Sequence, residues 1–99
     1  TVKLSKIGGL GVDLGGHLPT YLSSALDGPV GIAAAAHAAQ TLPPDSPWPG
    51  IAHGLATERL FESTICAEGG LLDGATLSPP DGAGLGITID EAALASHRL

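Results

Sequence analysis

Aromatic residues, cysteine and basic residues are all scarce in this chain of 99 residues. The aromatic side chains are Tyr21, Trp48 and Phe61, so a core has to be built from Ala, Leu, Ile and Val, with glycines allowing close approach. Four Lys and Arg residues face ten Asp and Glu residues, which gives a net charge of -6. Because no basic patch is present to neutralise phosphates, we expect no binding to nucleic acid or to an anionic membrane.

The scarcity of cysteine and of long apolar runs bears on the cellular compartment of the protein. Cys66 is the single cysteine and cannot form an internal disulfide, and the chain does not open with a secretory signal pattern, so we expect a reducing cytoplasm. The longest apolar run, residues 30–36, is too short to cross a bilayer. The chain opens with Thr1 and enters a strand-like pattern at once, which favours a segment of a longer reading frame. An apolar content of 43% permits one small core.

Short strands are predicted in three places. Residues 1–7 alternate in polarity with a period of two, and residues 18–24 and 51–55 are similar extended runs. The glycine-rich segment 10–17 predicts a loop with at most a short helix, and the proline-rich segment 45–49 predicts a rigid surface loop.

Helices are predicted after the second and third strands. Asp27-Gly28-Pro29 is a helix start, with Asp27 as the capping residue, and the alanine-rich run 30–41 has the best helix propensity of the chain. The prolines after Leu42 end it. Thr57 is predicted to cap a second helix that runs to about Cys66. The apolar stripe of this second helix would consist of Leu60, Phe61 and Ile65.

The C-terminal third predicts a hairpin, an extended segment and a short helix. Residues 71–77 form the hairpin, with Asp73-Gly74 in a type I′ turn. Residues 87–89 are extended, and Asp90 caps a helix over residues 91–97.

Strands that alternate with helices predict an α/β fold with a parallel sheet. Three such strands cannot bury both faces of a sheet by themselves, and a complete barrel of this kind takes about 250 residues. We therefore expect residues 1–67 to be the last three strands of a TIM-type (β/α) barrel with their helices. Residues 68–99 would be a C-terminal hairpin and tail that returns toward a capping domain.

Four segments carry a resemblance to a known family. Lys-Leu-Ser-Lys-Ile-Gly-Gly (3–9) is similar to the sixth-strand motif of muconate-cycloisomerase-type enzymes of the enolase superfamily. Residues 23–31 and 53–57 resemble the ends of their seventh and eighth strands, and residues 81–91 resemble the segment that returns to the capping domain. The four motifs occur in the family's order over nearly the whole chain. Between Gly9 and Ser23, where the family has a full helix, this sequence is shorter by about one helical turn.

The resemblance implies one catalytic residue in this chain, Lys3. In the family this lysine faces a substrate α-carbon while Mg²⁺ holds the carboxylate and stabilises the enediolate. In succinylbenzoate synthases the base is a lysine on the second strand, and the lysine at the Lys3 position stabilises the anionic intermediate by its charge. The Mg²⁺ ligands belong to strands outside this chain, so we expect no metal ligand here and no activity from the chain alone. On the residues alone, Lys3 could equally be a solvated lysine at the rim of a strand.

The substrate expected from the resemblance is a small carboxylate, bound at the ends of the second and third strands. Ser23 and Ser24 lie where a succinyl side chain or a carboxylate would be held, and the helix that begins at Pro29 would direct its N-terminal N–H groups toward that anion. A serine pair that merely closes a strand is the structural alternative. The predicted substrate-binding residues are Ser23, Ser24, Ala25, Gly54 and Leu55.

Within the group, o-succinylbenzoate synthase fits best, as a dehydratase of menaquinone biosynthesis, and N-acylamino acid racemase and muconate cycloisomerase remain open. A dipeptide epimerase is disfavoured because residues 53–57 lack an Asp-x-Asp. A truncated relic without catalysis, or a binding module, is the alternative from a different class. A serine-nucleophile triad is disfavoured because no G-x-S-x-G surrounds Ser24. A zinc site is disfavoured because the His and Cys residues lack ligand spacing. The glycines do not match the pattern of a phosphate-binding loop.

Overall fold

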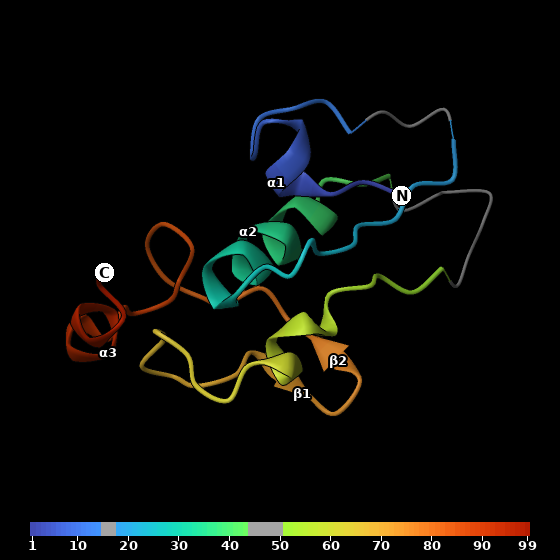
Figure 1. Cartoon of the computed structure of the whole chain (residues 1–99). Coiled ribbons are helices and arrows are strands. Elements are labelled where there is room, and N and C mark those ends of the chain that lie inside the picture. Colours follow the sequence, from blue (N-terminus) through green and yellow to red (C-terminus); the bar gives the residue numbers. More distant parts are fainter. Residues whose placement is uncertain (15–17, 44–50) are drawn as a thin grey trace.

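The computed structural model describes residues 1–14, 18–43 and 51–99. Figure 1 shows one long helix, α2, at the centre, a small hairpin on one side of it, and a short helix, α3, at the far end of the molecule. The elements are α1 (Leu4–Ile7), α2 (Pro29–Ala39), the 3₁₀ helix η1 (Ala56–Leu60), β1 (Leu72–Asp73), β2 (Thr76–Leu77) and α3 (Glu91–Ser96).

The alanine-rich helix is confirmed as α2, but its start differs from the prediction. Gly28 is the N-cap and Pro29 the first helical residue, where the missing N–H of proline costs no hydrogen bond. Asp27 makes no cap bond to the helix, and its Oδ2 instead accepts from the Ala25 N–H at 2.8 Å. At the other end, the Thr41 N–H and Oγ1 both donate to the Ala38 carbonyl, at 3.0 and 2.8 Å.

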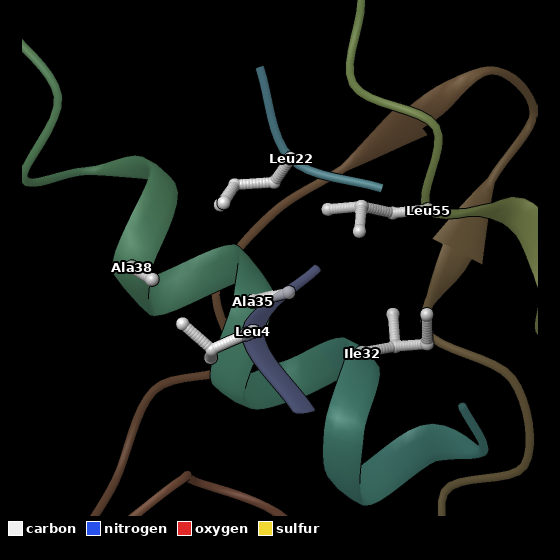
Figure 2. Close-up of a cluster of buried hydrophobic side chains, with 6 residues drawn as sticks. All are labelled: Leu4, Leu22, Ile32, Ala35, Ala38 and Leu55. Carbon is white, nitrogen blue, oxygen red and sulfur yellow. The ribbon is translucent and has the colours of Figure 1, made fainter. Parts of the chain in front are cut away.

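One face of α2 forms the core together with side chains from three other segments. Figure 2 shows these side chains converging from α2, from α1 and from two extended stretches of chain. Leu22 and Ile32 have no exposed surface at all. Because the helix contributes mainly alanines, the leucines of the other segments can approach its backbone closely. The buried cluster consists of Leu4, Leu22, Ile32, Ala35, Ala38 and Leu55.

The three predicted strands lie side by side and parallel, but each contact is a single bridge. Val2 pairs with Leu22, and Ser23 pairs with Gly54. The Ser23 N–H donates to the Val2 carbonyl at 2.8 Å, and the Gly54 N–H donates to the Leu22 carbonyl at 2.8 Å. Residues 4–7, which were predicted to continue the first strand, form α1 instead. Gly8 ends α1 in the left-handed conformation, at a φ of 110°.

The prediction of a partial TIM-type barrel is therefore wrong. Within the described residues the sheet is two-stranded and antiparallel, formed by β1 and β2, and it is not closed. Parallel strands need a crossover of about a dozen residues or more, usually a helix. Among the described residues, the crossover between the first two bridged segments holds only the four-residue α1, whereas α2 lies between the second and the third. Without successive strand-and-helix units, the parallel contacts do not extend beyond single bridges.

The prediction of a second helix, from Thr57 to about Cys66, is also wrong. The chain forms only η1, five residues long, and Phe61 returns to an extended conformation. Leu60 and Phe61 are 70% and 44% exposed, so they do not form the expected buried stripe. The proline-rich loop 45–49, and with it Trp48, lies outside the described residues, as do residues 15–17 of the glycine-rich loop.

The hairpin and the last helix are confirmed. Leu72 pairs with Leu77 and Asp73 with Thr76, so Gly74 and Ala75 form the turn, one residue later than predicted. Gly74 has a φ of 58°, and Ala75 does not have a positive φ, so the turn is not type I′. Asp90 caps α3, with its Oδ1 accepting from the Ala93 N–H at 2.9 Å.

A carboxylate ties residues 66–68 to the extended segment before α3. Cys66 and Ile89 form an antiparallel bridge, and the Glu68 carboxylate accepts from the Thr88 N–H at 3.1 Å and from the Cys66 thiol at 2.9 Å. These hydrogen bonds, first that of Cys66 and then those of Thr88, lower the pKa of Glu68 to about 2. Desolvation by burial, and the hydrogen bond to Glu68, raise the pKa of the Cys66 thiol. No helix within the described ranges is long and apolar enough to cross a membrane.

Truncation of the central core residue tests the packing. Ile32→Ala is expected to lower the free energy of unfolding by about 2–5 kcal/mol, because it removes buried methyl groups and leaves a cavity against Leu22 and Leu55. Val30→Ala on the same helix, where the side chain is 38% exposed, is the matched control and should change stability by less than about 0.5 kcal/mol. Urea unfolding followed by circular dichroism measures both. Equal losses would contradict this core.

The Glu68 contacts predict a dependence of stability on pH. Since the pKa of Glu68 in the folded chain is about 2, below its ordinary value of 4.5, its stabilising contribution is complete above about pH 4.5. It is lost as the pH falls toward 2. The melting temperature of the unaltered protein should therefore fall more steeply between pH 4.5 and 2 than that of Glu68→Gln. Parallel melting curves for the two proteins over this range would show that the contacts do not persist in solution.

Candidate functional site

The side chain of Lys3 points to the end of the neighbouring extended segment. Lys3 itself has an extended backbone, with φ of -110° and ψ of 103°, immediately before α1. Lys3 is an exposed residue, and its Nζ donates to the carbonyl oxygen of the buried Ser24 at 2.6 Å. A charged donor on a neutral carbonyl makes a short, strong hydrogen bond. The structure thus brings together the predicted catalytic residue and one of the predicted substrate-binding residues.

Ser24 is held by hydroxyl and backbone groups from three segments. The residue is only 7% exposed, and its backbone N–H donates to the Gly54 carbonyl at 3.0 Å. Thr57 Oγ1 lies 2.8 Å from Ser24 Oγ and 3.1 Å from the carbonyl oxygen of Asp27. Because a hydroxyl has one proton, Thr57 can donate to only one of these partners at a time. Thr57, which the sequence predicted as a helix cap, is instead a side-chain link between η1 and the segment that carries Ser24.

Ser23 and Ser24 do not act as a pair. Successive side chains of an extended segment point to opposite faces, and Ser24 faces Thr57 while Ser23 faces away from it. Ser23 Oγ is buried and makes no hydrogen bond within the described part of the chain. A Cβ on Gly54 would lie 3.3 Å from Ser23 Cβ, so a glycine at position 54 relieves the close contact between the two bridged residues.

The backbone between Ser24 and α2 makes a strained turn. Leu26 has a φ of 65°, the left-handed region that non-glycine residues rarely adopt, and its side chain is 65% exposed. The Ala25 N–H is used by Asp27 Oδ2. Residues in such conformations persist only where the surrounding structure holds them, and they cluster at functional sites.

The N-terminus of α2 already faces a carboxylate of this chain. An added Cβ on Gly31 would lie 2.7 Å from Asp27 Cβ and 3.4 Å from Asp27 Oδ1, so the Asp27 side chain sits against the first turn of the helix. The positive end of the helix dipole favours this negative charge. The Asp27 side chain therefore lies beside the helix start at which the sequence predicted a substrate anion.

The remaining predicted site residues contribute backbone groups or packing. Gly54 donates its N–H to Leu22 and accepts from the Ser24 N–H. Leu55 is 4% exposed and belongs to the core, so its side chain contributes packing rather than a group that could contact a substrate. In the part of the chain that the structure describes, which excludes His17, no three His, Cys, Asp or Glu side chains lie close enough to hold a metal ion.

Sequence reasoning missed the roles of Asp27 and Thr57. Both were interpreted as helix caps because each precedes a helix-like run, and the two residue types are common at that position. The contacts that they make instead, to Ala25 and across to Ser24, depend on how the chain folds back, which no local pattern encodes.

Removing the hydroxyl of Thr57 tests this network. Thr57→Val keeps the shape of the side chain but removes the 2.8 Å partner of Ser24 Oγ, which retains its 3.4 Å hydrogen bond to the Gly54 carbonyl, so the variant should destabilise the chain by about 0.5–1.5 kcal/mol. Thr57→Ser keeps the hydroxyl and should retain most of the stability. Chemical unfolding of the two variants side by side measures the difference. A valine variant as stable as the serine variant would mean that the hydroxyl bonds contribute nothing.

Comparisons of the chain with protein-family models, with curated proteins and with solved structures found no match.

Proposed function

We propose that this chain supplies the charge-stabilising lysine of a Mg²⁺-dependent o-succinylbenzoate synthase of the enolase superfamily. The reaction would be the dehydration of a succinyl-hydroxycyclohexadiene carboxylate in menaquinone biosynthesis, through an enediolate intermediate. The chain would act as part of a longer cytoplasmic protein and would be inactive alone. The proposal rests on the four ordered motifs at residues 3–9, 23–31, 53–57 and 81–91.

One observation supports the proposal most directly: the contact of 2.6 Å between Lys3 Nζ and the carbonyl oxygen of Ser24. It places the amine among the ends of two neighbouring segments, as the proposed role requires. A lysine ammonium has three N–H groups, so the bond to Ser24 leaves donors for a bound anion. Because the partner is a neutral carbonyl, the positive charge of the amine is not cancelled by it.

The position of Asp27 restricts where a substrate could bind. Its carboxylate lies against the first turn of α2, and a second anion at that helix end would be repelled. The enediolate would therefore lie at the Lys3 amine rather than at the start of α2. Bound Mg²⁺ would hold the substrate carboxylate and stabilise the negative charge, with ligands from segments other than this chain.

Two other reactions of the same group use a lysine at this position. N-acylamino acid racemase and muconate cycloisomerase also pass through an enolate stabilised by Mg²⁺. Both activities therefore remain alternatives within the proposal.

A role without catalysis, as a truncated relic or a binding module, is the second candidate. The observation that favours it is the fold, because single parallel bridges and the four-residue α1 replace the strand-and-helix units of an enolase-superfamily barrel. In that case the contact between Lys3 and Ser24 would serve only to join the two segments.

Substitution of Lys3 in the longer protein separates these candidates. Lys3→Ala should lower the turnover of the dehydration by about 10²- to 10³-fold, the range typical for loss of a group that stabilises the charge of an anionic intermediate. Lys6→Ala is the matched control, because Lys6 is an exposed residue at the end of α1, and it should leave turnover unchanged. Steady-state assays with Mg²⁺ and the cyclohexadiene substrate measure both variants.

The circular dichroism spectrum of Lys3→Ala shows whether the protein remains folded. Unchanged turnover in a folded Lys3→Ala protein would reject the catalytic role and favour the relic or binding module. A folded variant that loses dehydration but retains substrate binding would support the proposed charge stabilisation.

A further inference from the structure

A separate hollow lies between the C-terminal half of α2, η1 and the hairpin. Its volume is about 570 Å³, within the range of about 300–1,000 Å³ that small-molecule sites occupy. Figure 1 shows the hairpin and η1 next to each other, with the chain from residue 51 leading into η1. Neither Lys3 nor Ser24 lines this hollow, although Leu55, one of the predicted substrate-binding residues, forms part of its wall.

The walls of the hollow are mostly apolar and small. Ala36 and Ala39 contribute from α2, Leu55 from the core, and Leu72 and Leu77 from the inward face of the hairpin. Alanines leave space where larger residues would fill it, and burial of apolar ligand surface there is favourable by roughly 25 cal/mol per Å². The walls therefore suit a molecule with an apolar body.

The charge at the hollow is positive although the chain as a whole is acidic. Arg59 is the charged residue that lines it, and Asp and Glu are absent from the lining among the described residues. The carboxylate of the preceding residue, Glu58, is turned to the backbone of Leu71 and Leu72, whose N–H groups donate to its Oε1 at 2.8 and 2.7 Å. A guanidinium that faces a cavity without a carboxylate favours an anionic ligand.

Two backbone contacts hold the polar groups of the hollow in place. Arg59 Nη2 donates to the Gly74 carbonyl in the hairpin turn, which leaves the other N–H groups of the guanidinium available. His53 Nδ1 accepts from the Leu22 N–H at 3.1 Å, so the neutral imidazole carries its proton on Nε2 and has a donor to offer. Both polar residues can therefore donate to an acceptor group of a ligand.

We propose that this hollow is a binding site for a small monocarboxylate with an apolar body, with its carboxylate on Arg59 and His53 and its apolar end among the alanines and leucines of α2 and the hairpin. The observation that carries the proposal is the combination of one fixed cation, the absence of lining acids, and apolar walls. The proposal is independent of the role of Lys3.

The test compares two ligands that differ only in charge. Titration of 4-phenylbutyrate into the unaltered protein, followed by amide chemical shifts in NMR, should perturb the amides of residues 36–40 and 72–77. 4-Phenylbutanamide, the neutral analogue, should bind roughly tenfold or more weakly, because a hydrogen bond to a charged partner is stronger than one to a neutral partner. This comparison needs no variant and cannot be confused with a folding defect.

Variants locate the charge that the ligand meets. Arg59→Gln should weaken binding of 4-phenylbutyrate by roughly tenfold or more, and Arg98→Gln, which changes the other arginine of the chain, should leave it unaltered. Lys3→Ala should also leave binding unaltered, which separates this proposal from the proposed function. Ala39→Leu should block the hollow and abolish the shifts.

Three results would overturn the proposal. They are equal affinities for the acid and the amide, equal affinities in the two arginine variants, and an absence of shifts at millimolar 4-phenylbutyrate.

Discussion

The packing of one alanine-rich helix face against three leucines is the interaction on which the rest of this structure depends. Ile32, Ala35 and Ala38 of α2 meet Leu4, Leu22 and Leu55 from three separate segments. With few aromatic residues and a helix face made mainly of alanines, burial depends on close approach rather than on volume. The consequence is that the three segments must lie next to one another along the helix, and the single parallel bridges between them follow from that arrangement.

This core fixes the positions of Lys3 and Ser24, because successive side chains of an extended segment point to opposite faces. Leu22 and Ser24 face the core side of one extended segment, and Leu4, which follows Lys3, is buried beside them. Once Leu22 and Leu4 are fixed in the core, Lys3 and Ser24 are confined to adjoining positions, and the contact between Nζ and the Ser24 carbonyl becomes possible. Thr57 closes the group from η1. The site is therefore a by-product of where the leucines are placed.

Local signals predicted the parts of the fold that depend on a few neighbouring residues. Pro29 with the alanine run predicted α2, Asp90 predicted the start of α3, and Gly74 predicted a tight turn. The predicted helix after Thr57 and the parallel sheet failed because both require a partner surface, and Leu60 and Phe61 remain exposed without one. In the candidate site, Lys3 lies near Ser24, but its amine contacts the backbone carbonyl of that residue, so the catalytic and substrate-binding roles stay predictions. The position of Asp27 at the helix start did not match the prediction, because an aspartate before a helix predicts a cap whether or not its carboxylate makes that bond.

Lys3 and Arg59 share one electrostatic property that links the two proposed sites. In a chain of net charge -6, each donates to a backbone carbonyl, Ser24 for the amine and Gly74 for the guanidinium. A carbonyl dipole orients a cation without cancelling its charge, whereas a carboxylate at the same distance would neutralise it. Both side chains are thus held in place by a neutral partner, and their positive charge stays available to an anionic ligand. In a chain with a net negative charge, these two cations are therefore the positions at which an anionic ligand would be attracted in the two proposals.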